Sequence, residues 1–157
     1  MANVAHASLT GADLHEPKGA ASATSGQVYV ANGAGSGTWT DINNQNKIFV
    51  HYTFENISTA GSQWVVPGIA GDVTKIHSVL HGAIASADCG LTFEIGGTAM
   101  TSSAITITQA GSAAGDVDTS SPSANNTITA DQPIEIISDG LSTNNVNATI
   151  TFTIDVS

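Results

Sequence analysis

The clearest pattern in the chain is a strict alternation of apolar and polar residues near its end. Over residues 146–156 every second residue is apolar, and the residues between them are Asn, Thr or Asp. Successive side chains of a β-strand point to opposite faces of its sheet. This segment therefore predicts a strand with one buried face and one face that meets water or a partner.

Shorter segments with the same period recur from residue 46 onward, with turn signals between them. They predict strands over residues 47–54, 63–66, 91–95, 105–108 and 133–137. Residues 73–85 fit a helix stripe as well as a strand face, but their β-branched content and the internal Gly82 favour a strand. We expect a long loop rich in Gly, Ala, Ser and Asp from about residue 109 to residue 126. Seven or eight strands predict an all-β domain over residues 46–157: a single antiparallel β-sandwich, jelly-roll-like.

Residues 1–45 follow a different pattern, with isolated apolar residues among Ala, Gly, Ser, Thr and Asn. Only residues 27–30 have a strand pattern. So little clustered apolar area cannot offset roughly 1–2 kcal/mol per residue of backbone ordering. We therefore expect an extended N-terminal arm that another surface orders. The residues expected to make those contacts are His6, Leu9, Leu14, His15, Val28, Tyr29, Val30 and Trp39.

The charge balance narrows the class of partner. Only 10% of residues are charged, against about 25% in ordinary soluble domains, a bias typical of extracellular, fibrous or virion proteins. Thirteen carboxylates oppose three lysines, and the formal net charge is −10. This argues against nucleic acid and anionic membranes as partners. The N-terminus lacks a signal-peptide pattern, so we expect synthesis in a cytoplasm, where the protein either stays soluble or leaves only as part of a larger assembly.

No motif in the sequence indicates catalysis, a cofactor or a metal site, so we do not expect an enzyme. His77 and His81 would share one face of a strand at roughly 13 Å, too far for one metal ion. On a helix they could be ligands, but the Glu of a zinc-protease motif is absent. Asp116 and Asp118 have a spacing that calcium sites use, yet the rest of a calcium loop is missing, so a solvated acidic loop is favoured over a cation site. Cys89 has no basic neighbour in sequence, which favours a small structural residue over a nucleophile.

Two parts of the sequence carry a resemblance. The first is a leader that reads HASLTGADLHEPKG over residues 6–19 and VYVANGAGSGTW over residues 28–39. It resembles a leader of tailed-bacteriophage structural proteins, which include head fibres, tail fibres and capsid decoration (cement) proteins. The second part comprises VTKIHSVLHGAIASAD (residues 73–88), LTFEI (residues 91–95) and GSAAGDVD (residues 111–118). It is similar to the β-sandwich module of those proteins.

The resemblance implies a capsid decoration protein: a small trimeric jelly roll on the outer capsid surface of a virion, made in the bacterial host cytoplasm, with an extended arm that joins neighbouring capsomers. The partners implied are the major capsid protein, other copies in a homotrimer and neighbouring decoration subunits. The family shares no catalytic residues. Because the sequence ends directly after one sandwich, at Ser157, we rank decoration above a fibre role.

Two alternatives come from other classes of protein. The first is a head- or tail-fibre adhesin that binds host glycan through Trp64 or Tyr52. The second, a glycan hydrolase, needs a cleft with paired carboxylates.

Overall fold

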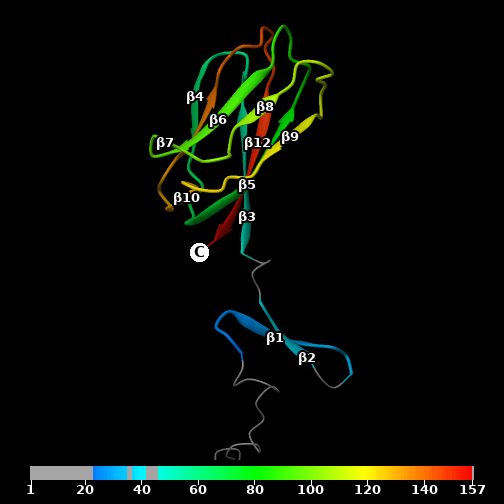
Figure 1. Ribbon diagram of the computed structural model, residues 1–157, viewed down its shortest axis with the longest axis vertical. Helices are drawn as coiled ribbons and strands as arrows, with labels where there is room; N and C mark the ends of the chain where they lie inside the picture. The colour runs from blue at the N-terminus through cyan, green and yellow to red at the C-terminus, as the bar shows by residue number, and fades with distance from the viewer. Residues whose placement is uncertain (1–22, 35–36, 42–45, 157) are drawn as a thin grey trace, which may run out of the picture. The chain divides into compact units, whose positions relative to one another are not determined.

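The computed structural model describes residues 23–34, 37–41 and 46–156, and the chain divides between Gln45 and Asn46 into two units. The first unit contains a β-hairpin and the second contains ten strands (Figure 1). Within the described residues, no helix is long and apolar enough to cross a membrane.

Two five-stranded antiparallel sheets make up the second unit. In sheet I the order is β10-β5-β12-β3, with β9 also paired to β5; in sheet II it is β4-β11-β6-β7, with β8 also paired to β6. The strands of sheet I are β3 (Lys47–Phe54), β5 (Gly71–Leu80), β9 (Val117–Ser120), β10 (Thr127–Ile128) and β12 (Ala148–Val156). The strands of sheet II are β4 (Gly61–Val65), β6 (Cys89–Ile95), β7 (Thr98–Ala99), β8 (Ile105–Ile107) and β11 (Ile134–Ser138).

The connections between these strands follow the jelly-roll order. Apart from the two-residue strands β7 and β10, the sheets are β3-β12-β5-β9 and β4-β11-β6-β8. The chain crosses from one sheet to the other between β3 and β4, β4 and β5, β5 and β6, β8 and β9, and on either side of β11. Eight strands connected in this way form two Greek keys. The predicted all-β, jelly-roll-like sandwich is therefore confirmed.

The core lies between the inner faces of the two sheets. Strand β12 contributes Ala148, Ile150, Phe152 and Ile154, each 0% exposed. The ring of Phe152 meets that of Phe93 from sheet II edge to face, with the ring centroids 5.7 Å apart. Aromatic pairs favour this geometry, and each fully buried side chain of this size contributes about 1.5–3 kcal/mol.

Strand β5 settles the ambiguity over residues 73–85. It runs antiparallel to β12 over nearly its whole length, with a register shift at Thr153/Ile154. Val73, Ile76 and Leu80 are buried. The predicted strand is confirmed for residues 73–80, whereas residues 81–85 lie outside any strand.

The predicted loop over residues 109–126 is wrong in one part, because it contains β9 (Val117–Ser120). Its inward positions hold Asp118 and Ser120 and its outward positions Val117 and Thr119, as the pairing with β5 shows. A short strand whose inward residues are polar lacks the apolar alternation that identifies strands in a sequence.

The first unit contains strands β1 (Gln27–Ala31) and β2 (Gly37–Asp41), which pair antiparallel. The sequence predicts a strand over residues 27–30, and the structure adds a partner for it. Strand β2 gave no strand signal because Trp39 is its only large apolar residue.

Two leucines allow a test of the core. Leu91 is 0% exposed between the sheets, whereas Leu141 is 62% exposed on a loop. We expect Leu91→Ala to lower the free energy of unfolding by about 2–5 kcal/mol, because the truncation leaves a cavity. The matched variant Leu141→Ala should change it by no more than about 0.5 kcal/mol. Urea denaturation at one protein concentration measures both, and equal losses would contradict this placement of the core.

Candidate functional site

The N-terminal hairpin holds the described members of the predicted contact set. Val28 is paired with Thr40 and Val30 with Thr38, so these four residues share one face. Val28 and Val30 are 42% and 49% exposed. Short β-branched side chains thus make an accessible surface on this face of the hairpin.

The opposite face of the hairpin holds the two aromatic residues of the set. Tyr29 and Trp39 are directly paired and half-buried, with their ring centroids 5.4 Å apart in an edge-to-face arrangement. A Cβ atom on Gly37 would come within 2.8 Å of the Tyr29 ring and 2.3 Å of the Val30 carbonyl oxygen. Glycine at this position therefore allows the ring to lie over β2.

The structure thus brings Val28, Tyr29, Val30 and Trp39 together on one hairpin but divides them between two faces. His6, Leu9, Leu14 and His15 lie outside the described residues. A two-stranded hairpin by itself is at best marginally stable in water. A partner surface that covers one of its faces would supply the missing burial.

A second candidate surface is the outer face of sheet I. Its central row consists of His51, Thr151, His77 and Thr119, which are successive cross-strand partners on β3, β12, β5 and β9. His51 Nδ1 and Thr151 Oγ1 lie 2.9 Å apart, within hydrogen-bond distance. His81 Nε2 makes a similar contact, 2.8 Å, with Thr149 Oγ1 on the same face. His77 and His81 thus lie on one side of the sheet, as strand spacing predicts.

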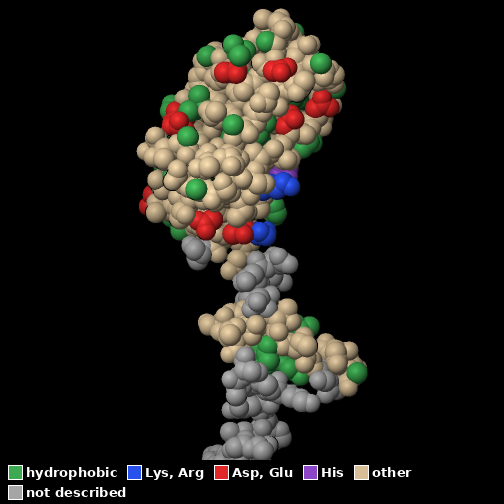
Figure 2. Space-filling model, viewed as in Figure 1, with side chains coloured by type: hydrophobic (Ala, Val, Ile, Leu, Met, Phe, Trp, Pro, Cys, Tyr) green, Lys and Arg blue, Asp and Glu red, His purple; other side chains and the backbone are tan. Residues whose placement is uncertain are grey.

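Every described lysine and histidine belongs to this side of the molecule. Lys47 and Lys75 occupy outward positions of β3 and β5, opposite Asp155 and Thr153 of β12. Lys47 Nζ forms an ion pair with Asp155 Oδ1 at 2.5 Å. In Figure 2 the visible Lys and His side chains lie together on one side of the sandwich, and acidic side chains are spread over the rest of that view.

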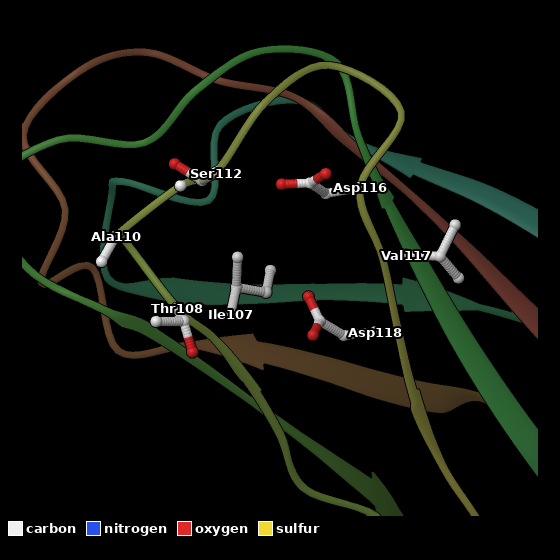
Figure 3. A pocket seen from close by; sticks show the side chains of 8 residues that line it. Ile107, Thr108, Ala110, Ser112, Asp116, Val117 and Asp118 are labelled. Carbon is white, nitrogen blue, oxygen red and sulfur yellow. The ribbon is translucent and has the colours of Figure 1, made fainter.

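The acidic pair lies at a small pocket between β8 and β9 (Figure 3). Its volume is about 190 Å³, and Figure 3 shows the carboxylates of Asp116 and Asp118 on its inner side with Val117 turned away. Asp116 Oδ2 accepts a hydrogen bond from the Ala113 N–H at 2.7 Å. Burial first, and then the negative charge of Asp116, raise the pKa of Asp118 above its ordinary value.

Metal ligands do not gather at this pocket or elsewhere in the part of the chain that the structure describes. No group of three or more His, Cys, Asp or Glu side chains there could hold a metal ion.

Cys89 is buried, and its Sγ donates a hydrogen bond to the Ile57 carbonyl oxygen at 3.3 Å. Burial is the main cause that raises the pKa of this thiol. Since the thiolate is the reactive form, the thiol is a poor nucleophile.

The two aromatic residues of the adhesin alternative have different surroundings. Tyr52 is half-buried on the inward side of β3 and packs against the core. Trp64 is 56% exposed on the outer face of sheet II. Trp64, Glu135 and Glu94 are successive cross-strand partners, so an indole and two carboxylates form one row. Glu94 and Glu135 carry no joint signal in the sequence, because 41 positions separate them and only the sheet register brings them together.

A scan against known protein-family models found no match, and a search of curated proteins found none either.

The raised pKa of Asp118 gives a test by pH. Below its pKa in the unfolded chain, the carboxyl is protonated in both states and the shift has no effect on stability. Above the raised folded pKa it is ionised in both, and the folded state is disfavoured. We therefore expect Asp118→Asn to stabilise the protein at pH 7, with a gain that shrinks as the pH falls from the raised folded pKa to the ordinary pKa of Asp and is absent below it. Urea denaturation across this range measures the gain. The matched variant Asp131→Asn, on an exposed turn, should show a smaller gain at pH 7; an equal gain would contradict the assignment.

Proposed function

We propose that this chain is a bacteriophage capsid decoration protein. Its jelly roll lies on the outer capsid surface and its N-terminal segment binds the major capsid protein, which stabilises contacts between capsomers. The observation that carries the proposal is the hairpin, a separate unit from the jelly roll that exposes Val28 and Val30. The same segment carries the leader that resembles phage virion proteins. An element that is marginally stable alone and common to different modules suits an attachment device.

The energetics of attachment support this division of roles. Full burial of such a side chain from an exposed state contributes roughly 1.5–3 kcal/mol, and a partner that covers Val28 and Val30, 42% and 49% exposed, would supply about half of that for each. Ordering the rest of the segment opposes that gain. The outer edges of β1 and β2 can also pair with an exposed sheet edge of the partner, since strand addition supplies main-chain hydrogen bonds. Several copies bound to one shell would raise the effective affinity further.

The jelly roll supplies the fold. The buried apolar side chains of its core all lie between Phe54 and Ile154 in the sequence, and they come from both sheets. None of those side chains comes from the hairpin. The second unit can therefore keep its core when the first is removed.

A second function, glycan binding by a fibre adhesin, is favoured by one observation. Trp64 presents an exposed indole beside Glu135 and Glu94. An aromatic face can stack on the apolar face of a sugar ring, and carboxylates accept hydrogen bonds from its hydroxyl groups. We rank this function second because the row contains a single aromatic residue.

Truncation tests the role of the N-terminal segment. We expect deletion of residues 1–45 to leave a folded β-domain with a cooperative melt, because the core lies outside this segment. Binding to capsids that lack the protein should be lost, as measured by co-sedimentation. Within the full chain, Val30→Asp should weaken binding, whereas the matched Val66→Asp, at a residue 55% exposed on the jelly roll, should not. Wild-type binding by the truncated protein would place attachment in the jelly roll.

Copy number separates the two functions. We expect purified virions to contain hundreds of copies of the chain, because a decoration protein occupies repeated positions over the whole shell. Quantitative mass spectrometry against the major capsid protein measures the ratio. A dozen copies or fewer would favour a fibre and overturn the decoration role.

A further inference from the structure

We propose that the outer face of sheet I is buried between copies of this chain, which meet there around a symmetry axis. The inference concerns self-association of the free protein and does not depend on capsid attachment. Three properties of the face support it: its hydrogen-bonding chemistry, its lack of net charge and its exposed apolar residues.

The chemistry of the central row is self-complementary. A symmetry axis brings a residue close to the same residue of another copy, so the groups there must be able to bond to their own kind. The row consists of Thr119, His77, Thr151 and His51. A threonine hydroxyl and a neutral imidazole each donate and accept hydrogen bonds, whereas lysine only donates and a carboxylate only accepts. Identical copies can therefore pair across this row.

The face is also the part of this acidic chain where copies can approach most closely. With a net charge of −10, copies repel one another over most of their surface. Within the strands of sheet I the outward carboxylates are Asp72 and Asp155, and the outward lysines are Lys47 and Lys75. These charges balance, and both carboxylates lie at one end of the face, away from the central row.

Exposed apolar residues flank the central row on both sides. Phe49, 58% exposed, is paired with Thr153 on one side, and Val117, 56% exposed, is paired with Val79 on the other. Protein interfaces are enriched in aromatic residues and depleted of charge at their centres. The remaining outward residues of the row and its neighbours are mostly threonines, which lose little rotamer freedom on burial. His51 and His81 are already held by threonine hydroxyls.

The outer face of sheet II differs in charge. Glu94 and Glu135 are direct cross-strand partners there and repel each other, as Asp72 and Asp155 do on sheet I, but on sheet I Lys47 forms an ion pair with Asp155. A second copy packed on the same face would bring further carboxylates to that pair. Because Lys47 and Lys75 balance the carboxylates of sheet I, that face suits contact between copies better than the outer face of sheet II.

The oligomeric state of the free, full-length protein tests the proposal. Sedimentation equilibrium should give a multiple of the chain mass of 15.8 kDa for the wild type. Thr151→Glu and Thr119→Glu should each reduce it to the monomer mass, because each brings carboxylates of different copies together around the axis. The conservative variant Thr151→Ser, which keeps the hydroxyl, should retain the wild-type mass.

The matched control is Thr106→Glu, since Thr106 is an exposed outward threonine of β8 on sheet II. It adds the same charge and should leave the mass unchanged. Circular dichroism melts identify any variant that fails to fold; Thr119 is exposed on a short strand and should tolerate the change even if Thr151 does not. A monomeric wild type, or folded Thr119→Glu that keeps the wild-type mass, would overturn the proposal. Capsid binding by a monomeric protein would leave the decoration role standing and remove this inference alone.

Discussion

The one-sided burial of β12 is the constraint on which the rest of the domain depends. Its inward side chains, Ala148, Ile150, Phe152 and Ile154, are fully enclosed, and the strand is paired on both edges, to β3 and to β5. A shift of its register by one residue would turn four core side chains to the outside and bring threonines into the core. The same alternation that fixes the core therefore also fixes which residues the outer face of sheet I presents. The alternation along β12 thus specifies both the core residues and the residues of the outer face.

How much of the fold could be predicted depended on whether a strand buries one face. The strands predicted over 47–54, 91–95 and 146–156 alternate apolar and polar residues, and the structure has strands there, with β6 beginning earlier, at Cys89, and β12 later, at Ala148. Strand β9 was missed because its inward residues are Asp118 and Ser120, and β2 because only Trp39 marks it. Both are held by pairing with a neighbour, β5 or β1, and that information is not local in the sequence.

The candidate surfaces divide in a similar way. The set Val28, Tyr29, Val30 and Trp39 could be named from the sequence because each is an apolar residue among small ones. Its division between two faces of a hairpin depends on β2. The row His51, Thr151, His77 and Thr119 draws on four segments up to 100 residues apart. Its members are unremarkable in sequence and become a surface only when the sheet order is known.

Cys89 has a practical consequence for experiments on this molecule. It is the only cysteine of the chain, and its thiol is buried beside the Ile57 carbonyl oxygen and Ser138. A cysteine introduced at an exposed site would therefore react with maleimide dyes much faster than Cys89. Fluorophores or spin labels can be attached at one chosen position in the natural background. Removal of Cys89, which would disturb a packed part of the core, is not needed first.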